Sequence, residues 1–234
     1  AAVFVFANTR NAVILMFSNY RRFIRMEHAG SWFMRTPSSL RAEDYRFYFF
    51  MSLMYILAVL LHTVLLFPLY FMLDNRITFV SDALCIPVDI LCFILLRMGR
   101  INVSLLLFVT AISAHTSLAI IVFGGSSSLS MFFISMYALV FFSHWKMLYK
   151  ILSGIVILFI TVGLSIYTLY AEPLTPLGQV QMVYWNCSNI ILNFFIVGYG
   201  IYYFSLIVNS TEKKLKYDAE HDVLTGVLNR NAIM

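Results

Sequence analysis

Residues 101–123 read INVSLLLFVTAISAHTSLAIIVF, a stretch without a single charged side chain. A helix needs about 20 mostly apolar residues to cross the hydrocarbon core of a bilayer, so this stretch predicts a membrane span. The rest of the chain has the same character. Of the 234 residues, 61% are hydrophobic and 12% are charged, and the mean hydropathy is +0.85. A soluble domain of this length could not carry that composition on its surface, so the chain is expected to be an integral membrane protein.

The same criterion predicts six spans, and therefore an all-α membrane protein built as a six-helix bundle over residues 46–208. The boundaries between spans fall at short polar or charged connections. The predicted spans are residues 46–73, 78–96, 101–123, 129–145, 148–170 and 181–208.

Basic residues predict the orientation, because lysine and arginine are retained on the cytoplasmic side during insertion. They gather before the first span, in the second and fourth connections and after the last span, whereas the opposite side has Arg76 alone. Both termini are therefore expected in the cytoplasm. The net charge of +5 follows from this bias, so no nucleic-acid partner is needed to explain it.

The first 45 residues precede the predicted bundle and contain an amphipathic pattern over residues 11–26. Apolar side chains such as Val13, Phe17 and Ile24 recur at helical spacing, with Arg21 and Arg25 toward the other face. The pattern predicts an interfacial helix on the lipid bilayer, with arginines toward anionic headgroups. The alternative is a helix packed on the cytoplasmic ends of the bundle.

Among the ionisable residues of the predicted spans, four are singled out because they lie away from the span ends, and a charge at a helix centre costs about 2.5–3.5 kcal/mol. They are His62 in the first span, Asp82 and Asp89 in the second, and His115 in the third. Asp82 and Asp89 are seven residues apart and fall near one helix face. Adjacent spans would let all four side chains meet in a polar pocket.

Three uses of that pocket remain open. It can bind a small molecule or protons as a sensor; it can bind a metal ion such as zinc, or haem between two axial histidines; or the residues can pair only to fix helix packing. Aromatic and apolar surroundings are compatible with a lipid, small-molecule or ion signal.

The last span contains a polar stripe, Asn186, Asn189 and Asn193, at helical spacing. Asparagines in a span seek partners on other helices, so the stripe is interpreted as a contact between two sixth helices of a homodimer. The competing interpretation turns it inward to line the pocket. Residues 209–220 are expected to continue the helix into water as a signalling helix, with Leu215 in a weak coiled-coil seam.

The tail, residues 221–234, reads HDVLTGVLNRNAIM. Its fixed positions resemble the opening of a GGDEF domain, the catalytic unit of diguanylate cyclases. The resemblance covers only this tail. The matching residues are Asp222, Leu224, Thr225, Gly226, Asn229 and Arg230.

The resemblance implies a membrane sensor that controls a cytoplasmic cyclase in the bacterial inner membrane. In that family two GTP molecules condense to cyclic di-GMP across a homodimer, with Mg²⁺ on the phosphates. The catalytic residues of the family lie downstream of this motif, so no catalytic residue is expected among these 234. Control is expected through dimer geometry, because each half-site presents one substrate to the other.

Other readings of the sequence stay open. The output could be a degenerate GGDEF domain, a hybrid with a phosphodiesterase, or a pure assembly scaffold. From a different class, the buried charges permit a transporter or channel.

Overall fold

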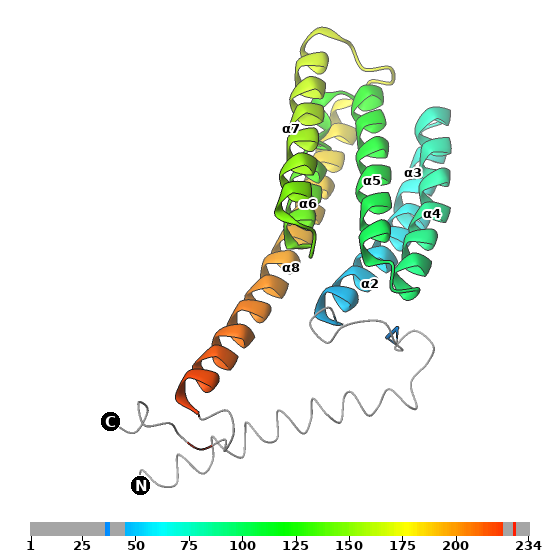
Figure 1. Cartoon of the computed structure of the whole chain (residues 1–234). Helices are drawn as coiled ribbons and strands as arrows, with labels where there is room; N and C mark the ends of the chain where they lie inside the picture. The colour runs from blue at the N-terminus through cyan, green and yellow to red at the C-terminus, as the bar shows by residue number, and fades with distance from the viewer. Residues whose placement is uncertain (1–35, 38–44, 222–226, 228–234) are drawn as a thin grey trace, which may run out of the picture. The chain divides into compact units, whose positions relative to one another are not determined.

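The computed structural model describes residues 36–37, 45–221 and 227, and the chain divides into a unit of residues 1–45 and a second unit of residues 46–234. The elements of the second unit between residues 46 and 220 are all helices, joined by short connections (Figure 1). The predicted amphipathic helix at 11–26 lies outside the described residues. The elements are α2 (Tyr45–Leu60), η4 (Leu61–Leu66), α3 (Phe67–Met72), α4 (Arg76–Arg97), α5 (Ile101–Phe123), η5 (Gly125–Ser127), α6 (Met131–Phe142), α7 (Met147–Tyr170) and α8 (Gln179–Glu220).

Five helical segments in the described part of the chain are long and apolar enough to cross a membrane. The first of them joins α2, η4 and α3 into one continuous segment, and the others are α4, α5, α7 and α8. The expectation of an all-α bundle with membrane-length helices is therefore confirmed. Four of the six predicted spans match these helices within a few residues at both ends, and the last one matches at its start but lies in a helix that continues to Glu220.

The fourth predicted span, 129–145, is longer than the helix that the structure has there. The helix there, α6, has 12 residues, which is about 18 Å at 1.5 Å per residue and shorter than a bilayer core. Serines shorten it at both ends. Ser128 has a left-handed backbone with φ 54°, and Ser143 is extended and donates its hydroxyl to the Val140 carbonyl at 2.6 Å. Such local serine bonds compete with the helix backbone.

One end of the bundle gathers the α3–α4 turn, the end of α5 and the α7–α8 connection. Thr175 joins them, because its backbone N–H donates to the Val122 carbonyl at 2.9 Å and its hydroxyl accepts from Asn75 Nδ2 at 2.7 Å. Asn75 also caps α4 by accepting from the Thr78 N–H at 3.0 Å. We call this the Thr175 end.

The opposite end brings the start of α2 to the end of α4 and to the α6–α7 connection. Arg97 donates to the Tyr48 hydroxyl at 2.7 Å, and the Phe47 ring packs edge-on against His144 with centroids 5.2 Å apart. We call this the Arg97 end. Although α6 is short, the chain therefore runs from the Thr175 end to the Arg97 end between α5 and α7.

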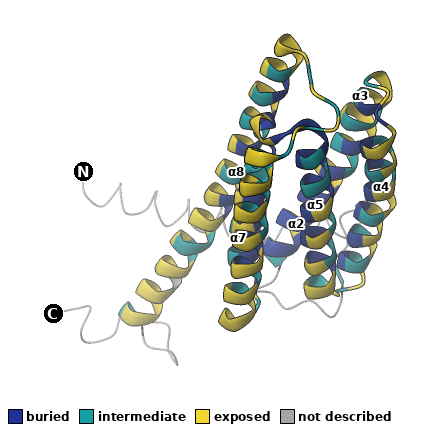
Figure 2. Ribbon diagram, turned by 90° about the horizontal axis from the view of Figure 1, so that it is seen from above, coloured by how far each residue is buried: buried dark blue, intermediate teal, exposed yellow. Residues whose placement is uncertain are grey.

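The buried residues lie on the inward sides of the first helix, α4 and α5, while α7 and the C-terminal half of α8 are mostly exposed (Figure 2). On α4 the buried positions form one stripe with spacings of four and three residues, which is the helical seam expected for a helix with one packed side. Half of the most apolar window of α5 is buried, which makes α5 the central helix of the core.

The last helix, α8, is a single helix of 42 residues and is about 63 Å long. Near the Arg97 end it packs on α6, where the rings of Phe142 and Phe204 stack with centroids 5.6 Å apart. From Phe204 it continues for sixteen more residues to Glu220, most of them exposed, and extends beyond the other helices (Figure 1). The predicted signalling segment 209–220 is thus one helix with the last span.

Candidate functional site

His62 lies at the start of η4, a π-helical segment in the middle of the first span. The Phe67 N–H donates to the carbonyl of His62, which lies five residues before it. In an α-helix the acceptor would be the carbonyl four residues before it. Pro68 is the physical cause, because it has no N–H for the Val64 carbonyl and its ring would collide with that group in a regular helix. The wider turn is typical of functional positions in helices.

Asp82 and Asp89 come from the buried stripe of α4, as their spacing predicted, and both are fully buried. His62 Nδ1 shares a hydrogen bond of 2.5 Å with Asp82 Oδ1, and His62 Nε2 lies 3.7 Å from Asp89 Oδ2. One imidazole therefore stands between two carboxylates.

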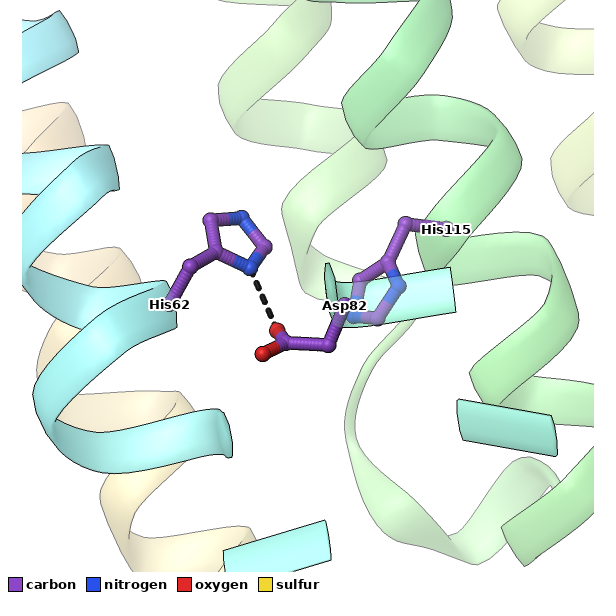
Figure 3. Close-up of side chains that lie close together, drawn as sticks. All are labelled: His62, Asp82 and His115. Carbon is purple, nitrogen blue, oxygen red and sulfur yellow. Dashed lines mark hydrogen bonds and ion pairs between the residues drawn. The ribbon is translucent and has the colours of Figure 1, made fainter. Parts of the chain in front are cut away.

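His115 enters from α5 and completes the group (Figure 3). Its ring lies edge-on to the His62 ring with centroids 5.3 Å apart, and its Nδ1 shares a hydrogen bond of 2.9 Å with the Ser81 hydroxyl. His62, Asp82, Asp89 and His115 thus meet as the sequence suggested, and we call them the His–Asp cluster.

Several polar atoms of the His–Asp cluster are buried without a hydrogen-bond partner. They are Asp82 Oδ2, both carboxylate oxygens of Asp89, and His115 Nε2. Buried polar atoms are normally bonded, and an unbonded buried carboxylate is among the costliest of them. The cluster therefore has unused capacity for a proton, a cation or a hydrogen-bonding ligand.

A cavity of about 340 Å³ adjoins the cluster, and we call it the histidine cavity. His62 and His115 form part of its wall, and α8 contributes Ser188, Asn189 and Leu192. Most of the remaining wall is apolar. A site with apolar walls and a few convergent polar groups is the usual form of a small-molecule pocket.

A second cavity, of about 460 Å³, also has His62 in its wall. Its walls come from the first helix, α5, α6 and α8, and they are almost entirely apolar, with Met54, Met136 and Gly200 among them. His62 and Leu192 line both cavities. A ligand in either cavity would therefore touch both the His–Asp cluster and α8.

Two of the three asparagines in the α8 stripe, Asn189 and Asn193, have hydrogen-bond partners inside the bundle, while the contact between two such helices in a homodimer stays a prediction. Asn189 Nδ2 donates to the Ser127 carbonyl at 3.0 Å, and the Ser135 hydroxyl donates to Asn193 Oδ1 at 2.6 Å. Both asparagines are buried, so their partners lie within the same chain. Asn186 is half-buried, and Leu215 is exposed on the extension of α8.

Three contributors to the site were missed by sequence reasoning. Ser81 orients His115, Tyr70 is fully buried with its ring 6.0 Å from that of His115, and the π turn positions His62. Of these three, only the π turn could have been predicted from the sequence, because Pro68 follows His62 by six residues inside an apolar run.

The residues that resemble the opening of a GGDEF domain, from Asp222 to Arg230, lie outside the described residues except for Val227. No protein-family model, curated protein or solved structure matches the chain.

Proposed function

We propose that this chain is the membrane input region of a signalling protein, and that α8 transmits the state of the His–Asp cluster to a GGDEF-type output domain. One observation carries the proposal. The same helix lines the histidine cavity with Ser188, Asn189 and Leu192 and runs without a break to Glu220, two residues before the motif that begins at Asp222.

The coupling in this proposal is mechanical and local. A ligand that fills the histidine cavity contacts α8 directly, and α8 is held to the bundle by the Asn189 and Asn193 bonds and by aromatic packing. If a ligand binds more tightly when α8 is in one position, it favours that position over the other. The free-energy difference between the two positions then changes by the difference in binding free energy, commonly 1–3 kcal/mol in allosteric proteins. A long single helix carries such a shift to its far end.

The proposed output is a diguanylate cyclase that works as a homodimer with Mg²⁺ and GTP. It rests on the resemblance of residues 222–230 to the entry of a GGDEF domain. Two half-sites must face each other for the reaction, so a shift or rotation of paired α8 helices changes how often they meet. The nature of the signal is left as a small molecule, lipid or ion.

The proposed location is the bacterial inner membrane with both termini in the cytoplasm. The supporting observation is that Arg97, Lys146 and Lys150 stand at or near the Arg97 end, where the positive-inside rule places the cytoplasm. The C-terminal extension of α8 leaves the bundle at that end, where GTP is available.

The test is turnover of GTP by the full-length protein in nanodiscs with Mg²⁺, with cyclic di-GMP identified by mass. The proposal expects product. Well-folded protein that makes no cyclic di-GMP would contradict the cyclase output, and ion flux through the same protein in liposomes would favour a transporter or channel instead.

A further inference from the structure

The three side chains His62, Asp82 and His115 converge from three helical segments, η4, α4 and α5, on one buried point (Figure 3). Each offers one ligand atom, and these atoms all lie within 4.8 Å of one another. Ligands around a tetrahedral ion at about 2.0–2.1 Å stand about 3.3 Å apart, so small rotations of the side chains would close the site.

The cluster also has atoms free to bind. Asp82 Oδ2 and His115 Nε2 are buried without a partner, and the Asp82 side chain is fully buried. When the Nδ1–H of His115 donates to the Ser81 oxygen at 2.9 Å, the lone pair remains on Nε2. A histidine ligand typically has this second hydrogen bond, which fixes its tautomer and orientation.

The charges of the cluster also favour a bound cation. Asp82 and Asp89 are two fully buried carboxylates, and the nearest positively chargeable group in the cluster is the single His62 ring between them. A protonated His62 would offset one negative charge of an ionised pair, and protonating His115 as well would place two positively charged rings with centroids only 5.3 Å apart. A divalent cation offsets both while the histidines stay neutral.

We propose that His62, Asp82 and His115 bind a divalent transition-metal ion of the zinc type, with Asp89 balancing its charge. Two imidazoles and a carboxylate suit zinc, whereas Mg²⁺ and Ca²⁺ prefer oxygen ligands throughout. A haem held between the two histidines is disfavoured, because the macrocycle would displace the Asp82 carboxylate from its place within 4.8 Å of both rings.

Metal binding by these residues is independent of any enzymatic output. That the ion regulates α8 rests on the proposed function, since the same His62 and His115 rings form part of the wall of the histidine cavity that α8 completes. A bound ion would fix the positions of those rings and of the three helical segments that hold the ligands.

The experiment measures zinc bound to this chain in nanodiscs, purified with a tag that lacks histidine, stripped with a chelator and titrated with Zn²⁺. Elemental analysis is expected to give one zinc per chain. His115→Gln and Asp82→Asn are expected to weaken binding by about tenfold or more, since even the loss of a supporting group costs 10–100-fold. The matched controls, His144→Gln and Asp74→Asn, lie outside the cluster and should keep the wild-type affinity.

Folded wild-type chain that takes up no zinc overturns the proposal, whatever the variants do. So does binding that survives in both cluster variants or is lost equally in the controls. Cobalt(II) gives a second readout that needs no variant, because nitrogen and oxygen ligands in a tetrahedral site produce visible absorption, and a spectrum of hydrated cobalt would also overturn it. Since none of these readouts uses GTP, failure here is distinct from failure of the cyclase proposal.

Discussion

At the residue scale, the contact between His62 and Asp82 joins two helices that are neighbours in sequence. The atoms are 2.5 Å apart and both side chains are buried, so each residue depends on the other for its hydrogen bond. Polar contacts between membrane helices stabilise by about 0.6 kcal/mol on average and up to about 1.7 kcal/mol. This contact belongs near the upper limit, because it is charge-assisted and dry.

A double-mutant cycle with His62→Ala and Asp82→Ala is therefore expected to give a coupling of about 1–2 kcal/mol in the free energy of unfolding. Unfolding in mixed micelles would measure it. The control cycle pairs His62→Ala with Asp74→Ala, an exposed residue on the adjoining turn, and should be additive. Additivity in the test cycle would mean that the pair is not formed.

The meeting of the four ionisable residues could be predicted from sequence, because ionisable side chains inside membrane spans usually face the bundle interior and pair with one another. The seven-residue spacing also places Asp82 and Asp89 on one helix face. The sequence could not predict which atoms of these residues remain without a hydrogen bond. That depends on the rotation of each helix, and Ser81 competes for His115 in a way that no spacing reveals.

At the element scale, the π turn of η4 decides which way His62 points. Pro68→Ala restores a backbone N–H that can bond to the Val64 carbonyl and lets the segment return to an α-helix. We expect the variant to remain folded but to bind zinc at least about tenfold more weakly, as when a supporting group is lost. Zinc titration measures this, with Pro176→Ala in the exposed α7–α8 connection as the control. Unchanged affinity would show that His62 does not depend on the turn.

The packing of α8 on α6 gives a second prediction at this scale. A Cβ added at Gly200 would meet Phe142 at 2.8 Å, whereas one at Gly198 meets nothing within 4 Å. Gly200→Val should therefore lower stability by about 1–3 kcal/mol through overpacking, while Gly198→Val stays within about 0.5 kcal/mol. Thermal unfolding in detergent compares the two. Equal effects would contradict the observed contact between the helices.

The same element shows what sequence reasoning could not decide. Asparagines at helical spacing in a span indicate interhelical bonds, but the spacing does not say whether the partner is in the same chain. Here the Ser127 carbonyl, in the serine-rich connection before α6, and the Ser135 hydroxyl, within α6, supply the partners. Hydropathy alone extended that helix through Leu129 and Trp145, because it ignores serine hydroxyls that bond to the backbone.

At the scale of the whole molecule, the contacts at the Thr175 end and the Arg97 end of the bundle give the direction of each helix. They allow a test of whether the short helix α6 crosses the membrane. Ser126→Cys lies near the Thr175 end and Lys146→Cys in the α6–α7 connection near the Arg97 end. We expect a membrane-impermeant maleimide to label the first on intact cells and the second only after permeabilisation. Labelling of both from one side would place α6 on one face of the membrane and make the number of crossings odd.

The central claim is that the interior of the bundle controls an output through α8. Leu192 lines both cavities from that helix, whereas Phe194, two residues on, is 75% exposed. Leu192→Trp fills the space that a ligand would occupy, and Phe194→Trp adds similar bulk on the outer face.

The decisive measurement is cyclic di-GMP formation by the full-length protein in nanodiscs, compared among wild type, Leu192→Trp and Phe194→Trp at equal amounts of folded protein. Leu192→Trp is expected to change the rate by about fivefold or more, the lower range of allosteric coupling, while Phe194→Trp should match wild type. Equal rates in all three proteins would contradict the central claim, because the output would then be indifferent to the cavity that α8 lines.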